Sequence, residues 1–213
     1  LGDHSILADL KNKIDQAGRI ARDLQTGIMK TRMIPVGLVF HRFMRPARDL
    51  ALELGKKVDI ELEGEETELD KNIVDALSEP FLHLLRNAID HAIEKPEERQ
   101  RKGKKPAGQI KLSAYQSGNS VFVEFQDDGR GLNAETIVKK AVERKLIEAG
   151  AILQPAEIHE LIFHPGFSTA DTVTDISGRG VGMSVVKKMV QEFSGSIQIR
   201  SEENRGSTFV LSF

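Results

Sequence analysis

The chain contains no cysteine among its 213 residues, which excludes disulfide bonds and metal sites built from thiolates. Lys and Arg number 30 against 32 Asp and Glu, so there is no excess charge to hold nucleic acid or anionic lipid. No apolar run approaches the roughly 18 residues of a membrane-spanning helix, and no secretory leader is visible. We therefore expect a globular cytoplasmic protein without nucleic-acid partners or membrane insertion. Because it starts at Leu1 rather than Met, we expect a fragment of a longer protein.

The first segment has the pattern of a helix in a bundle. Residues 5–34 contain no proline, and apolar residues recur in steps of three and four at Leu7, Leu10, Ile14, Ala17, Ala21, Leu24 and Ile28. A helix lying on its own domain is the alternative, but a narrow seam with alanine at its centre favours close packing between helices. Pro35 and Gly37 interrupt the pattern. We predict a bundle-forming helix over 1–36 and a separate domain over 37–213.

Periodicity beyond residue 37 predicts helices mixed with strands. The predicted helices cover 39–54, 70–93 and 181–194, with irregular helix over 134–163. The predicted strands cover 58–62, 109–115, 121–126, 196–201 and 207–212. The charged run 94–106 is predicted to be a solvated loop or short helix. Adjacent strand pairs with helices between them indicate an α+β fold, a two-layer α/β sandwich with a mixed sheet and helices on one face.

One predicted helix carries four polar side chains on one side. At about 100° per residue, an arc roughly 100° wide contains His83, Asn87, Asp90 and His91. Apolar residues cover the opposite side. Imidazole, amide and carboxylate groups at this spacing suit a metal ion or a phosphate-bearing substrate. For the two histidines, helix capping or core packing is the alternative.

Two glycine-rich motifs lie downstream. Residues 127–131, Asp-Asp-Gly-Arg-Gly, directly follow a strand, so the backbone can approach a flat ligand while a carboxylate accepts a hydrogen bond from an exocyclic amine. An ordinary surface turn is the alternative. Residues 178–183, Gly-Arg-Gly-Val-Gly-Met, open a helix whose free amides suit phosphate groups. The second motif is neither a P-loop nor a convincing Rossmann fingerprint.

The order of these motifs resembles the Bergerat-type ATP-binding fold shared by gyrase, Hsp90, histidine kinases and MutL. The amino-acid sequences of segments 29–35, 83–91 and 163–169 further resemble those of the CheA-type chemotaxis histidine kinases, and the resemblance covers roughly residues 24–213. This resemblance implies that the chain binds ATP and Mg²⁺ and transfers the γ-phosphoryl group to a histidine on a separate phosphotransfer domain. It also implies a homodimer formed through the N-terminal helix, and contacts with a coupling protein and chemoreceptors through further domains.

The resemblance implies roles for single residues. Asp127 would accept the adenine amine, and Asn87 would hold Mg²⁺, with His91 at the phosphate or metal end. His83 would assist catalysis near the γ-phosphate. A mobile lid over about 132–180 would cover the nucleotide. The other implied nucleotide-binding residues are Asp90, Gly129, Gly131, Ser168, Thr169, Gly178, Arg179, Gly180, Val181, Gly182, Met183, Lys187 and Ser207.

The residue one turn before Asn87 bears on the reaction. The ATPase branches of the superfamily typically place a glutamate there to activate water, and this chain has His83. That difference favours phosphoryl transfer over hydrolysis. The alternatives are an ATPase of the gyrase or Hsp90 type and a dimeric nucleotide-binding scaffold without activity. The chain also has Ala92, Ser184 and Ser207 where the family usually has Gly, Asp and Thr.

Overall fold

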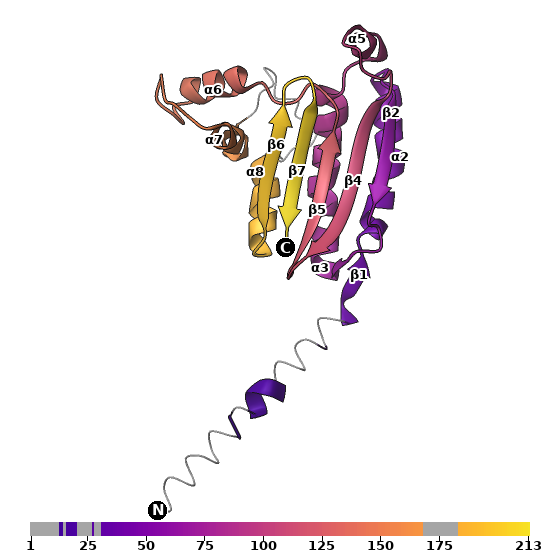
Figure 1. Cartoon of the computed structure of the whole chain (residues 1–213), viewed down its shortest axis with the longest axis vertical. Helices are drawn as coiled ribbons and strands as arrows, with labels where there is room; N and C mark the ends of the chain where they lie inside the picture. The colour runs from indigo at the N-terminus through magenta and orange to yellow at the C-terminus, as the bar shows by residue number, and fades with distance from the viewer. Residues whose placement is uncertain (1–12, 15, 21–26, 28–30, 168–182) are drawn as a thin grey trace, which may run out of the picture.

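The structure is a computed structural model that describes residues 13–14, 16–20, 27, 31–167 and 183–213. Its main body is a sandwich of one five-stranded sheet with helices packed along one face (Figure 1). The strand order is β2-β4-β5-β7-β6. The β2–β4 pair is parallel and the other neighbours are antiparallel, so the sheet is mixed. The predicted α+β sandwich is confirmed.

The strands of the sheet lie close to their predicted positions. They are β2 (Val58–Glu63), β4 (Gly108–Ser117), β5 (Ser120–Asp127), β6 (Ser196–Glu202) and β7 (Gly206–Ser212). Two strands were not predicted: β1 (Met33–Pro35) pairs antiparallel with β3 (Glu68–Asp70) outside the main sheet. Each has three residues, which is too short for an alternating pattern to be recognised.

The helices lie behind the sheet and beyond its end (Figure 1). They are α2 (Gly37–Glu53), α3 (Lys71–Ala76), α4 (Ser78–Asn87), α5 (Pro96–Arg101), α6 (Ala134–Glu143), α7 (Pro155–Glu160) and α8 (Met183–Glu192). A π-helical turn, η1 (Ala88–Ala92), extends α4, and a 3₁₀ turn, η2 (Leu161–Phe163), follows α7. The irregular helix predicted over 134–163 is thus two short helices and a turn.

The single helix predicted over 70–93 is wrong in detail, because it is divided into α3, α4 and η1. Pro80 lies in the first turn of α4 and has no N–H to donate to the preceding turn. The hydrogen bonds from Leu77 N to Ile73 O and from Phe81 N to Leu77 O still carry the chain across the junction. The segment therefore keeps one direction while its hydrogen-bond ladder is interrupted.

An aromatic series links the helical layer to the sheet. The ring of Phe81 on α4 lies 6.1 Å from the rings of Phe40 and Phe43 on α2 and 6.3 Å from Phe125 on β5. Phe125 in turn lies 6.4 Å from Phe209 on β7. All five side chains are buried. This packing holds α4, the helix with the polar face, against the centre of the sheet.

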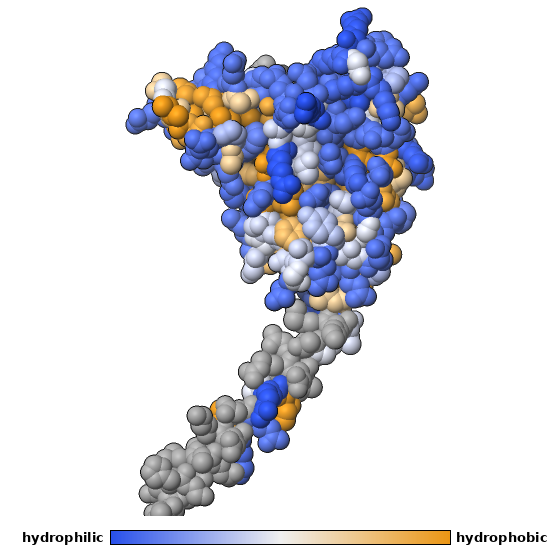
Figure 2. All heavy atoms as spheres, in the orientation of Figure 1, coloured by the Kyte–Doolittle hydropathy of each residue, from blue (hydrophilic) through white to orange (hydrophobic). Residues whose placement is uncertain are grey.

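Among the described residues, no helix lies over the opposite face of the sheet, and Figure 2 shows this face to be largely hydrophilic with small apolar patches. Strand β2 explains this character, because its residues alternate strictly between exposed and half-buried positions. The acidic side chains at Asp59, Glu61 and Glu63 face outward, while Val58, Ile60 and Leu62 pack against the core. Alternation of period two therefore turns one face of the sheet to the helices and the other to water.

The described residues before β1 are helical at 13–14, 16–20 and 27, as predicted for this segment. The bundle, the dimer and the boundary between residues 36 and 37 remain predictions. In the described part of the chain, no helix combines the length and apolar character needed to cross a membrane.

Candidate functional site

The polar face of α4 continues into η1, where the helical spacing changes. His83 and Asn87 are half-buried, whereas Asp90 and His91 are exposed. Within η1, the N–H of Ile93 donates to the carbonyl oxygen of Ala88, five residues earlier, over 2.7 Å. The uniform α-helical spacing assumed in the prediction therefore holds only as far as Asn87. Such π turns are frequent at functional sites, because they re-aim the side chains that follow.

A lysine that sequence reasoning did not identify holds the end of this turn. The Nζ atom of Lys56, in the loop after α2, donates to the carbonyl oxygens of Ile89 and Asp90 at 2.7 Å each. These carbonyls lie at the end of a helix, where the ladder supplies no partner. Burial lowers the pKa of Lys56, an effect that the nearby Asp90 opposes.

Replacing Lys56 by methionine is expected to lower the free energy of unfolding by about 1–2 kcal/mol, because two carbonyl groups lose their donor. Chemical denaturation measures this change. Lys57→Met is the matched control, since the Lys57 side chain is exposed and should tolerate the change. Equal stability of the two variants would contradict the assignment of Lys56.

Asp127 lies at the last position of β5, directly opposite Ser207 on β7. Its side chain is 3% exposed and accepts hydrogen bonds from the backbone N–H of Gly129 at 2.9 Å and from that of Ser207. Burial raises the pKa of Asp127 to about 6, and these hydrogen bonds oppose the rise. The carboxylate is therefore a buried acceptor at the end of the sheet, not part of an ordinary surface turn.

The loop after Asp127 packs directly on η1. A Cβ atom at Gly129 would lie 2.5 Å from the carbonyl carbon and oxygen of Ala92, so no side chain fits there. The N–H of Arg130 donates to the same carbonyl over 2.9 Å. Gly206 makes a similar close approach, because its Cβ would lie 2.0 Å from the carbonyl oxygen of Asp127. The glycines thus bring the end of the α4–η1 segment, the loop 127–131 and the start of β7 into one region.

Helix α8 completes this region from the other side of α4. The side-chain amide nitrogen of Asn87 lies 3.7 Å from the sulfur of Met183, the first residue of α8. One turn away along α4, burial lowers the pKa of His83, and the nearby Arg86 lowers it further. Both effects favour the neutral form of the His83 ring, in which one nitrogen can donate and the other can accept.

The segment 94–106 contains α5, the short helix that was one of its two predicted forms, but some of its charges are enclosed instead of solvated. Glu94 and Arg99 are fully buried and form an ion pair of 3.1 Å, and Arg99 also contacts the Asp128 carboxylate at 2.6 Å. Lys104 and Lys102 lie 3.2 Å and 3.3 Å from the second oxygen of Glu94. Burial alone would raise the pKa of Glu94. The hydrogen bonds that this carboxylate accepts outweigh burial, so its pKa is lowered overall. This network could not be predicted from the charge-rich sequence, because residue type does not show which charged side chains are buried.

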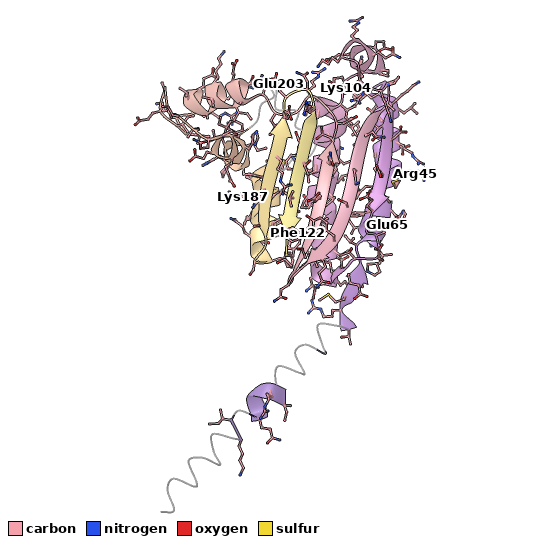
Figure 3. The ribbon with its side chains drawn as sticks, in the orientation of Figure 1. Arg45, Glu65, Lys104, Phe122, Lys187 and Glu203 are labelled. Atoms are coloured by element: carbon pink, nitrogen blue, oxygen red, sulfur yellow. The ribbon has the colours of Figure 1, made fainter. Side chains whose placement is uncertain are left out.

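Lys187 on α8 contacts α7 and the turn η2. Its ammonium pairs with Glu160 of α7 at 2.6 Å and stands 5.4 Å from the centre of the Phe163 ring (Figure 3). Its predicted contact with phosphate remains a prediction. Ser168, Thr169 and Gly178, Arg179, Gly180, Val181 and Gly182 lie outside the described residues, as does the last part of the predicted lid.

The donor set suits a magnesium ion held mainly by its nucleotide. Among the described residues, no group of three or more His, Asp or Glu side chains could hold a metal ion. Mg²⁺ usually binds through one or two protein oxygens together with phosphates and water, and the amide oxygen of Asn87 meets that need. His91, whose Nε2 lies 3.6 Å from Asp90 Oδ2, remains a predicted ligand.

One protein family and several curated proteins match this chain over most of its length. A sequence model of the family "Histidine kinase-, DNA gyrase B-, and HSP90-like ATPase" matches residues 74–213. The chemotaxis protein CheA of Bacillus subtilis is 48% identical over 205 residues, which cover 95% of this chain and 30% of that protein. The sensor histidine kinase CheAY of Helicobacter pylori is 45% identical over 204 residues, covering 95% and 25%. The chain thus spans less than a third of the curated relatives it matches.

Solved structures share the fold. The catalytic domain of the histidine kinase ThkA aligns with a TM-score of 0.51 and 19% identity, over 85% of this chain and 92% of that one. The histidine kinase domain of the blue-light activated kinase from Erythrobacter litoralis aligns with a TM-score of 0.50 and 15% identity, over 84% and 61%. At these identities the alignments establish the architecture alone.

Proposed function

We propose that this chain, which belongs to the histidine kinase-, DNA gyrase B- and HSP90-like ATPase family, is the ATP-binding catalytic core of a chemotaxis-type histidine kinase. The observation that carries the proposal is the junction of a buried carboxylate, Asp127, with the helix that bears Asn87 and His83. A buried acceptor suits an adenine amine, and an amide oxygen suits the ion that accompanies its phosphates. The strong similarity to the CheA proteins supports the same function.

In the proposed reaction, the bond between the γ-phosphorus and the β–γ bridging oxygen breaks, a bond forms to an imidazole nitrogen of the acceptor, and ADP leaves. Asp127 would orient the base, and Asn87 would hold Mg²⁺, which would supply positive charge that neutralises the phosphates. Positioning and electrostatic stabilisation supply most of the catalysis in such transfers. His83 would assist at the γ-phosphate, in the position where the ATPase branches typically have a glutamate that activates water.

Two substitutions test the residues on α4. Asn87→Asp and His83→Gln are each expected to reduce the rate of phosphoryl transfer at least about tenfold, since each removes a group that contacts the phosphates or their metal. Leu82→Gln is a matched control, because Leu82 lies on the same helix with an exposed side chain. Transfer at the unsubstituted rate in both variants would exclude these assignments.

Adding an isolated phosphotransfer domain and γ-labelled ATP to the chain tests the reaction itself. We expect label on a histidine of the acceptor, in the acid-labile and alkali-stable form of a phosphoramidate. Steady release of phosphate without acceptor would instead support an ATPase of the gyrase or Hsp90 type. Tight ATP binding with neither product would support a scaffold that has lost its activity.

The remaining partners belong to the same proposal. The proposal includes a cytoplasmic location, a phosphotransfer domain as acceptor, and a coupling protein and chemoreceptors reached through other domains. The apolar seam at residues 7–28 supports a homodimer through the N-terminal helix. Sedimentation at several protein concentrations would decide between monomer and dimer.

A further inference from the structure

We infer that Lys104, supported by Arg99, positions the loop 127–131 so that the Asp127 carboxylate meets the adenine amine, which makes Lys104 a determinant of nucleotide specificity. The inference rests on the proposed ATP-binding function. Lys104 is not itself one of the predicted nucleotide-binding residues. It acts through the backbone of the loop, and the contacts that carry this inference lie at the end of the sheet where β5 and α5 meet (Figures 1 and 3).

Lys104 holds two consecutive carbonyl groups of the loop. Its Nζ atom donates to the carbonyl oxygen of Asp128 at 2.8 Å and to that of Gly129 at 2.6 Å. Its third contact is the buried Glu94 carboxylate, 3.2 Å away, which fixes the ammonium in place. Only 16% of the Lys104 side chain is exposed, so the ammonium cannot swing freely into water. An ammonium has three donors, and these three acceptors use them all.

Arg99 holds the same loop through Asp128. Its guanidinium donates to Asp128 Oδ2 at 2.6 Å and to the Asp128 carbonyl oxygen at 3.3 Å. The other oxygen of that carboxylate accepts from the N–H of Gln109 over 2.8 Å. The N–H of Asp128 also donates to the carbonyl oxygen of Gln109 over 3.1 Å, so hydrogen bonds fix the peptide groups on both sides of Asp128.

Gly129 links these peptide groups to the Asp127 carboxylate. The Gly129 N–H donates to Asp127 Oδ1 at 2.9 Å, while the Gly129 carbonyl oxygen accepts from Lys104. A shift of this residue would move the donor that aims the carboxylate. The charge of Lys104 also lowers the pKa of Asp127, against the larger effect of burial. Lys104 thus favours both the direction and the ionised form of the carboxylate that would accept the amine.

The test compares ATP with purine riboside 5′-triphosphate, which lacks the amine that Asp127 would bind. In the full chain, Lys104→Met is expected to reduce the ratio of the two affinities about tenfold, by weakening ATP binding and sparing the analogue. Lys104→Arg should retain most of the ratio. Lys102→Met is the matched control, because Lys102 contacts Glu94 at 3.3 Å but no carbonyl of the loop. An unchanged ratio in Lys104→Met, even with both affinities lowered, would overturn the inference.

A measurement without nucleotide separates this inference from the proposed function. Carboxyl NMR of the unliganded chain should show a higher pKa for Asp127 in Lys104→Met, and the Gly129 amide should exchange faster with solvent. If the wild-type chain shows no preference for ATP over the analogue, the adenine-binding role of Asp127 fails. In that case, an unchanged Asp127 pKa and unchanged Gly129 exchange would overturn the positioning role as well, and altered values would support it.

Discussion

Asp127→Asn is expected to make the chain more stable at neutral pH and at the same time to weaken ATP binding about 10- to 100-fold. The carboxylate is ionised at pH 7 although burial raises its pKa from 3.8 to about 6. A carboxyl group whose pKa is higher in the folded state costs stability above that pKa and nothing below the unfolded value. The rise corresponds to about 3 kcal/mol of folding free energy at pH 7, which the neutral amide avoids.

The expected loss of binding has a geometric reason. If the asparagine oxygen keeps the hydrogen bond from Gly129, the amide nitrogen faces the adenine amine, and two donors oppose each other. Chemical denaturation at pH 7.5 and pH 4 should show that the gain in stability disappears in acid. The wild-type affinity for ATP should also fall below about pH 6, whereas that of the variant should not. Asp59→Asn, on an exposed position of β2, controls for charge. Lower stability with undiminished ATP affinity would contradict the assignment.

Arg99→Met is expected to lower the free energy of unfolding by about 3–5 kcal/mol, because it removes the buried cation that pairs with the buried Glu94 carboxylate. Both Arg99 and Glu94 are 0% exposed, and Glu94 would retain only the two lysines, at 3.2 Å and 3.3 Å. The carbonyl oxygen of Lys105 would also lose the Arg99 Nε donor, which lies 2.7 Å away. A loss of this size is a large part of the stability of an ordinary domain.

Urea denaturation of the full chain measures this loss. The control is Arg205→Met, which removes the exposed pair with Glu202 and should cost less than about 1 kcal/mol. The double variant Arg99→Met and Glu94→Met should recover part of the loss, since it removes the stranded carboxylate together with its partner. If Arg99→Met were as mild as Arg205→Met, the ion pair would contribute nothing to the fold.

Much of the sheet and of its helical layer could be predicted from periodicity. Strand β2 alternates apolar and acidic residues, and α4 places Phe81, Leu84 and Leu85 on its buried side, so each pattern indicates one element and one inward face. The short strands β1 and β3 could not be predicted, because three residues contain too little pattern. Pro80 was visible in the sequence, and it should have placed the start of α4 near Ser78.

Some of the polar residues near the site could be identified from the sequence, and others could not. Strand, turn and helix patterns singled out Asp127, Gly129 and Asn87, and the structure brings their elements together, while their roles in nucleotide binding remain predictions. Lys56, Glu94, Arg99 and Lys104 carry no such signal. Their partners lie far away in the sequence or on an irregular loop, and a lysine in a charged run looks the same whether it is solvated or enclosed.

The pattern of apolar residues was therefore sufficient to determine the α+β sandwich and the order of its motifs, since burial of one face follows local periodicity. Tertiary packing decided the polar interior. It buried the Glu94–Arg99 pair beneath the loop 127–131, changed the last turn after Asn87 to a π turn, and enclosed Asp127 enough to raise its pKa to about 6. The physical reason is that the energy of a polar group depends on which groups and how much water surround it, and those neighbours come from distant parts of the chain.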